Sequence, residues 1–98
     1  VATPTEAYAA LHAGADALKI FPAELVGPAA IKAIRTILPA GTRLFPVGGI
    51  SPETMPRFRD AGVAGVGLGS ALYKPGDGAD AVAIKARTFV AAMAEMRG

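Results

Sequence analysis

The sequence predicts an α/β fold, and within that class the C-terminal half of a (β/α)8 (TIM) barrel, forming a single domain over residues 1–98. Three observations lead to this prediction. Helix-like and strand-like segments alternate, a helix–strand unit recurs roughly every 24 residues, and glycines follow the strand-like segments at their carboxyl ends. Helices between successive strands imply parallel pairing, and short apolar strands imply burial on both faces.

The chain is short for a whole barrel. A barrel of this kind usually needs about 200 residues or more, whereas this chain has 98. An open, doubly wound sheet of about three or four strands is the alternative, because it could close its core alone. The glycines that recur at strand ends favour the barrel. Because the sequence begins at Val1, a few residues before a helix cap, we expect the other half to lie upstream.

The first helix and strand have clear boundary signals. Thr3 can cap the helix and Glu6 can reach back to the cap nitrogen, so the pattern predicts a helix over residues 4–13. Gly14 supplies the left-handed turn that ends it. Residues 17–22 (ALKIFP) then form a short apolar strand.

A later unit repeats this pattern, with Gly14 and Gly62 placed 48 positions apart. Its helix starts at residues 51–52 (Ser-Pro), and its strand covers residues 65–70 (GVGLGS). Pro56 removes a backbone donor within the first turns, so we expect this helix to be short or bent.

Between these units, Gly27 and Pro28 open another helix, and residues 43–47 form its following strand. A final helix is expected over residues 79–96. The residues that share the apolar face of the helix after Pro28 are Ala30, Ile31, Ile34, Ile37 and Leu38.

The composition excludes several classes of protein. With 52% hydrophobic and 18% charged residues, the chain is too apolar to be disordered. A net charge of +2 without a basic run gives little support for nucleic-acid binding. The apolar runs are interrupted too often to span a membrane. Without cysteine, and with one histidine and scattered acids, we predict no disulfide, metal site or cofactor, and a soluble cytoplasmic protein.

Lys19 is the most informative polar residue. Strand alternation puts Leu18 and Ile20 on one face and Lys19 on the other. In a barrel the Leu/Ile face meets the helices, so Lys19 points into the lumen, where desolvation favours the neutral, nucleophilic amine that forms a Schiff base. The alternative is a lysine near a strand end that reaches solvent or pairs with Asp16 or Glu24.

Glycine turns follow two neighbouring strands. Gly48 and Gly49 come after one strand, and Gly69 and Ser70 end the next. Their backbone N–H groups can approach an anion without a Cβ in the way, and barrels commonly hold a phosphate at such turns. The alternative is that these glycines only make tight turns and close packing.

Three motifs, taken in order, carry a family resemblance: ALKIFP (residues 17–22), FPVGG (45–49) and LGSALY (68–73). With these spacings the whole chain resembles the KDPG/KDPGal aldolase family. The resemblance implies a (β/α)8 barrel, usually a homotrimer, that reversibly cleaves a phosphorylated 2-keto-3-deoxy sugar acid to pyruvate and glyceraldehyde 3-phosphate. It implies no metal and no cofactor.

The resemblance also assigns roles to individual residues. Lys19 matches the lysine that forms the imine with the keto carbon, and Phe21 and Pro22 match walls of the pyruvate pocket. Val47 matches a position that faces the substrate. The groups that match the phosphate site are Gly48, Gly49, Gly69 and Ser70.

The substrate epimer is ambiguous in these motifs. Gluconate-type enzymes typically carry Thr where this chain has Val47, so Val47 and LGSALY favour the galactonate branch, whereas FPAE (residues 21–24) favours the gluconate branch. We predict the galactonate substrate. The family's glutamate acid/base comes from earlier strands, so we expect the segment alone to be inactive.

Two other functions share the glycine turns. One is a phosphate-binding barrel isomerase or synthase, in which Lys19 acts as an acid or an electrostatic group. The other is a non-catalytic phosphate-binding half-barrel or assembly module.

Overall fold

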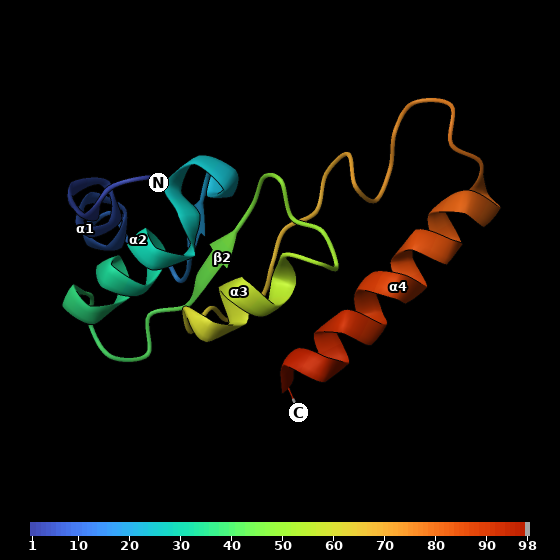
Figure 1. The fold of residues 1–98 in the computed structure, drawn as a ribbon. Coiled ribbons are helices and arrows are strands. Elements are labelled where there is room, and N and C mark those ends of the chain that lie inside the picture. The colour runs from blue at the N-terminus through green and yellow to red at the C-terminus, as the bar shows by residue number, and fades with distance from the viewer. Residues whose placement is uncertain (98) are drawn as a thin grey trace.

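The computed structural model describes residues 1–97, and the side chains of residues 1–95. Its elements alternate as helix and strand before ending in a long helix (Figure 1). In chain order they are α1 (Pro4–His12), β1 (Leu18–Ile20), α2 (Ala23–Ile37), β2 (Leu44–Pro46), α3 (Met55–Asp60) and α4 (Ala79–Arg97). The predicted α/β class is confirmed. The predicted order of helices and strands is confirmed up to β2. No helix within residues 1–97 is long and apolar enough to cross a membrane.

Four segments lie side by side in parallel order. β1 and β2 form a parallel pair. On the outer side of β1, the amino group of Val1 donates to the Lys19 carbonyl at 2.7 Å, and the Phe21 N–H donates to the Val1 carbonyl at 3.1 Å. On the outer side of β2, Val47 forms a parallel bridge with Gly67. The order Val1, β1, β2, Gly67 is therefore the chain order, as in the wall of a barrel.

The strand predicted over residues 65–70 is wrong as a regular element, because only the bridge at Gly67 forms. Alternate glycines at Gly65, Gly67 and Gly69 provide no side chains to pack, which weakens a strand. No strand among residues 1–97 pairs with the outer edge of this segment. It therefore gains pairing from one side only.

Local capping explains the helix starts. Thr3 Oγ1 accepts from the Glu6 N–H at 3.2 Å, while Glu6 Oε1 accepts from the Ala2 N–H at 2.9 Å rather than from the cap nitrogen. The Ala2 N–H and the Thr3 hydroxyl hold the pKa of Glu6 below its ordinary value. α3 is short, as predicted, and begins after a turn in which Ser51 and Thr54 exchange backbone-to-side-chain hydrogen bonds.

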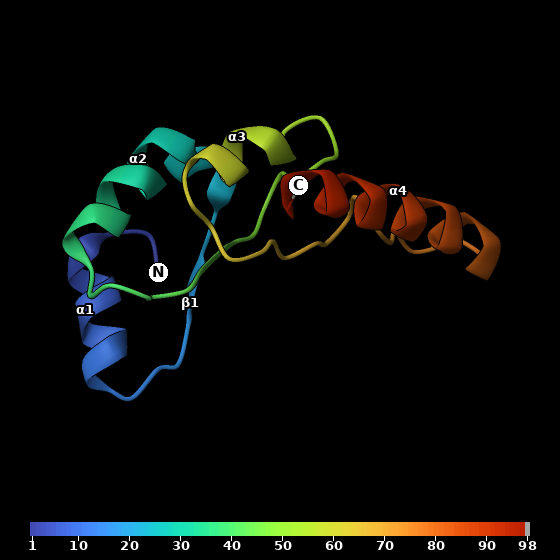
Figure 2. The same ribbon diagram turned by 90° about the horizontal axis from the view of Figure 1, so that it is seen from below.

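The helices cover one face of the strands. α1, α2 and α3 lie on the same side of β1 and β2 (Figure 2), and α4 stands apart and packs mainly on α3. The strand side chains turned toward the helices are buried, whereas Lys19 on the opposite face is exposed. Those buried strand residues are Leu18, Ile20, Leu44 and Pro46. The predicted alternation of β1 is confirmed.

The apolar face predicted for α2 is largely confirmed. Ile31, Ile34 and Leu38 are buried, but Ile37 is 51% exposed and does not belong to the core. Gly27 has a φ of 82° and interrupts the helix, so its regular part begins at Pro28. The predicted start at Gly27 and Pro28 therefore marks this interruption.

Replacing Ile31 with alanine is expected to lower the free energy of unfolding by about 2–5 kcal/mol, because it removes a fully buried side chain and leaves a cavity. Ile37→Ala on the same helix is the matched control, and its half-exposed side chain predicts a loss of less than about 1 kcal/mol. Equilibrium urea unfolding measures both. Equal losses for the two variants would show that Ile31 and Ile37 do not lie on the buried and exposed faces of α2, respectively.

Candidate functional site

A cavity of about 300 Å³ opens at the carboxyl ends of β1 and β2. The segments that follow both strands, and the turn after Gly67, contribute its walls. In parallel α/β folds this end of the strands carries the binding sites. The predicted site residues that line it are Phe21, Val47, Gly48, Gly49, Gly69 and Ser70.

Lys19 lies two positions before Phe21, which is part of the cavity wall. Its Cα is opposite that of Phe45 in β2, and its Nζ is 5.3 Å from the centre of the Phe21 ring. Phe21 lines the cavity and is 52% exposed. The aromatic ring therefore contacts the amine and also forms part of the cavity wall.

Lys19 has no ion-pair partner among the side chains of residues 1–95, so the predicted alternative pairing with Asp16 or Glu24 does not occur there. The residue is also exposed. Residues 1–95 thus do not supply the desolvation that a nucleophilic amine needs. Cover for Lys19 has to come from other protein segments or from the substrate.

The Gly48–Gly49 turn has two properties that require glycine. Its φ angles are 110° and 67°, in the left-handed region. The carboxylate of Glu24 packs against both residues: a Cβ on Gly48 would lie 2.9 Å from Glu24 Oε1, and one on Gly49 would overlap Glu24 Oε2. The alternative explanation of these glycines, that they make a tight turn and allow close packing, therefore applies to Gly48 and Gly49.

Gly69 differs from this pair. It has no left-handed φ, and a Cβ built on it would meet no atom within 4 Å. Its carbonyl accepts from the Leu72 and Tyr73 N–H groups at 2.9 and 3.1 Å, which closes a single turn after Ser70. The protein therefore does not need glycine here for packing, and the open space borders the cavity.

Backbone donors are available on both turns. Within residues 1–97, the N–H groups of Gly48, Gly49, Gly69 and Ser70 donate to no protein acceptor. Unpaired backbone N–H groups gathered around one cavity form a suitable site for an oxyanion such as phosphate. The site can therefore present several donors to one anion.

Val47 and Pro22 occupy different places. Val47 lines the cavity, and its side chain fills the space that a Cβ on Gly67 would need. Pro22 does not line the cavity; it precedes α2, and its carbonyl accepts from the Val26 N–H at 3.0 Å. Pro22 thus positions the first turn of α2, which carries Glu24.

Glu24, which follows the Lys19 strand, also belongs to the cavity wall. It lines the cavity and contacts Gly48 and Gly49, and it is also exposed to solvent. Its place directly after the ALKIFP motif was the available signal. No group of three or more His, Cys, Asp or Glu side chains within the described residues could hold a metal ion.

One carboxylate holds the loop before α4. Asp77 accepts from Lys85 Nζ at 2.8 Å and from the Lys74 N–H at 2.9 Å. These bonds, that of Lys85 first, hold the pKa of Asp77 below its ordinary value. The ionised Asp77 therefore links the loop that follows the Ser70 turn to α4.

Known proteins match this chain over almost its whole length. A family model described as KDPG and KHG aldolase matches residues 1–86. The 2-dehydro-3-deoxy-6-phosphogalactonate aldolase of Escherichia coli K12 is 50% identical over 94 residues, which cover 96% of this chain and 46% of that protein. A probable enzyme of the same name from Rhizobium meliloti 1021 is 47% identical over 92 residues, covering 94% and 43%.

Solved structures agree. A structure described as native KDPGal has a TM-score of 0.96 and 49% identity, covering 98% of this chain and 47% of that one. A 4-hydroxy-2-oxoglutarate/2-dehydro-3-deoxyphosphogluconate aldolase from TTHB1 has a TM-score of 0.78 and 35% identity, covering 95% and 46%. The chain thus spans about half the length of the relatives it matches.

Proposed function

The chain belongs to the KDPG and KHG aldolase family, and we propose that it is the C-terminal half of a (β/α)8 barrel that cleaves 2-dehydro-3-deoxy-6-phosphogalactonate to pyruvate and glyceraldehyde 3-phosphate. One observation carries the proposal: Lys19 Nζ lies 5.3 Å from the centre of the Phe21 ring, and Phe21 lines the same cavity as the two glycine turns. The curated relatives named above support the galactonate substrate.

Lys19 is the proposed nucleophile. Its amine attacks the keto carbon, and the carbinolamine loses water to give a protonated imine. The C4 hydroxyl loses its proton, the C3–C4 bond breaks, and its electron pair moves into the imine to give an enamine and the phosphorylated aldehyde. Protonation of the enamine at C3 and hydrolysis of the imine release pyruvate and restore the amine. The group that moves these protons belongs, in this proposal, to the N-terminal half.

The cavity residues bind the rest of the substrate. The N–H groups of Gly48, Gly49, Gly69 and Ser70 hold the phosphate, because they are free donors around one cavity. The family resemblance assigns Phe21 and Pro22 to the pyruvate pocket, and the Phe21 ring supports this because it lies next to the Lys19 amine. No metal or cofactor takes part. The homotrimeric assembly that the family resemblance implies, and the cytoplasmic location expected from the composition, belong to the same proposal.

The proposal is tested by assaying the full-length protein that carries this segment with both C4-epimeric phosphorylated sugar acids, following pyruvate with lactate dehydrogenase and NADH. We expect pyruvate release from both, with the galactonate epimer preferred. Preference for the other epimer would support the gluconate-type enzyme that the FPAE motif favours. Absence of pyruvate release from either substrate would refute aldolase activity.

Val47→Thr is expected to lower the preference for the galactonate epimer by about threefold to tenfold in the ratio of kcat/KM values, the effect of one hydrogen bond. Threonine has nearly the shape of valine, so its packing on Gly67 is retained and only a hydroxyl is added at the cavity. Val63→Thr, outside the cavity, is the control. An unchanged ratio for Val47→Thr would show that this position does not select the epimer.

A further inference from the structure

Glu24 places a carboxylate in the wall of the cavity that is proposed to bind phosphate. Its carboxylate lies against Gly48 and Gly49, at the wall where the proposed phosphate donors are gathered. None of the hydrogen bonds formed within residues 1–95 involves this carboxylate. A negative group is therefore held by packing at a place suited to bind a negative ligand, and the two would repel each other.

A second cavity lies on the other side of Glu24. It has a volume of about 210 Å³ and is bordered by Glu24 and Gly49 together with Thr54 and Arg57 from the start of α3. Glu24 is thus the side chain shared by the two cavities. A carboxylate that leaves the first cavity has space in the second, which the side chain of Arg57 also borders.

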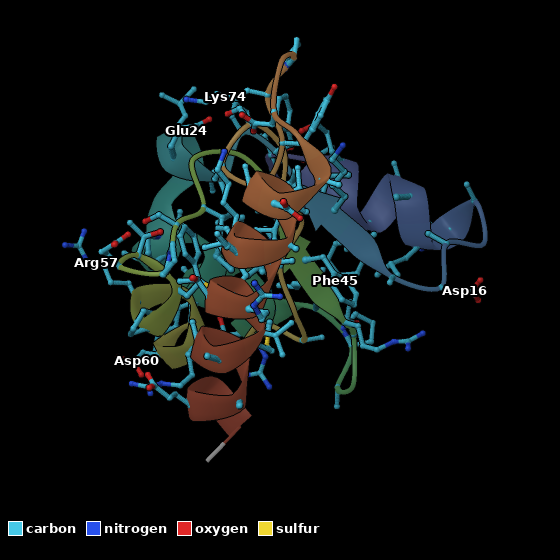
Figure 3. The ribbon with its side chains drawn as sticks, turned by 90° about the vertical axis from the view of Figure 1, so that its right-hand side faces the viewer. Asp16, Glu24, Phe45, Arg57, Asp60 and Lys74 are labelled. Atoms are coloured by element: carbon cyan, nitrogen blue, oxygen red, sulfur yellow. The ribbon has the colours of Figure 1, made fainter. Side chains whose placement is uncertain are left out.

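Arg57 is available as a partner for the displaced carboxylate. Neither Glu24 nor Arg57 forms an ion pair with any side chain of residues 1–95. Figure 3 shows the two side chains extending from α2 and α3 on the same side of the molecule, with their ends apart. Both side chains border the second cavity and have stems with several rotatable bonds, so each can change rotamer there.

We propose that Glu24 is a displaceable carboxylate: it competes with the ligand phosphate for the glycine-turn cavity and turns toward Arg57 when a phosphate ester binds. The inference rests on the proposed function, because it assumes that this cavity binds the phosphate of the substrate. Glu24 then weakens phosphate binding, which favours release of the phosphorylated product. Arg57 acts as a positioning residue that stabilises the displaced carboxylate.

Inorganic phosphate is the probe, and its dissociation constant is measured by calorimetry on the full-length protein that carries this segment. Because Glu24 is exposed and its charge is screened, Glu24→Gln is expected to bind phosphate about fivefold more tightly. Glu24→Ala removes the same charge and must also tighten binding. Asp16→Asn is the matched control; Asp16 is an exposed carboxylate before β1, at the opposite end of the strand, and its loss should leave the constant unchanged.

A double-mutant cycle tests the role of Arg57. Arg57→Gln alone should weaken phosphate binding by about threefold, as expected for loss of an exposed ion pair. In the Glu24→Gln background the same change should have no effect. Additive effects of the two changes would show that Arg57 acts on phosphate directly, and would overturn its assigned role.

The outcomes separate this inference from the proposed function. If wild type binds phosphate but Glu24→Gln and Glu24→Ala bind it no more tightly, the displaceable carboxylate is refuted and the aldolase proposal stands. If wild type neither binds phosphate nor releases pyruvate from either epimer, both proposals fail together. Tighter binding in both Glu24 variants, with no effect of Arg57→Gln in the Glu24→Gln background, supports the inference.

Discussion

Replacing Lys19 with arginine in the full-length protein is expected to lower kcat for cleavage by about 10³-fold or more, the loss seen when a covalent nucleophile is removed. Arginine keeps the positive charge next to Phe21 but stays protonated and cannot form an imine. The exposure of Lys19 predicts little change in stability. Steady-state pyruvate release and thermal unfolding measure the two effects separately.

Chemical trapping identifies the bond that Lys19 forms. Borohydride reduction of the wild type in the presence of pyruvate should add one pyruvate-derived group to the peptide that contains Lys19, and none to the Lys19→Arg protein. Lys32→Arg, an exposed lysine on α2, is the control and should be trapped like wild type. Trapping at another lysine, or retained activity in Lys19→Arg, would rule out the proposed nucleophile.

The sequence pattern predicts the strand face on which Lys19 lies, because only one rule is needed. In a strand with period 2, the buried Leu18 and Ile20 determine the face of the residue between them. The same rule applies to β2, where Leu44 and Pro46 are buried and the intervening residue is not. These predictions depend on neighbours in sequence, so they do not require knowledge of the rest of the fold.

The rule fails where pairing depends on distant segments. Residues 65–70 have the apolar pattern of a strand, but pairing on one side only gives a single bridge at Gly67. Ile37 fits the helical period of α2, yet it is half exposed and does not belong to the core. The periodicity of a segment does not determine how many tertiary contacts each of its residues makes.

The cavity was partly predictable. Two glycine turns after parallel strands must meet at one edge of the sheet, which places Gly48 and Gly69 around the same cavity. Glu24 was not predictable in this way, because its contact with Gly49 depends on how the first turn of α2 folds back from Pro22. Because of this contact, Gly49 is required for packing against Glu24, whereas Gly69 has no such contact.

Alanine at Gly49 should therefore affect stability, whereas alanine at Gly69 should affect substrate binding. Gly49→Ala is expected to lower the free energy of unfolding by about 1–3 kcal/mol, because a Cβ is strained at a left-handed φ of 67° and overlaps Glu24. In a Glu24→Ala background the overlap is removed and the loss should shrink to the backbone part, about 1–2 kcal/mol. Urea unfolding of the four proteins in this cycle measures the coupling.

Gly69→Ala places a methyl group in the open space at the cavity, without strain and without contact to protein atoms. Stability should change by less than about 0.5 kcal/mol, whereas KM for the phosphorylated substrate should rise about tenfold as the methyl displaces the phosphate from its donors. Pyruvate carries no phosphate, so its borohydride trapping at Lys19 should be unaffected. If the substitution instead slows pyruvate trapping as much as it raises KM, the Gly69 turn acts on the nucleophile and not on the phosphate.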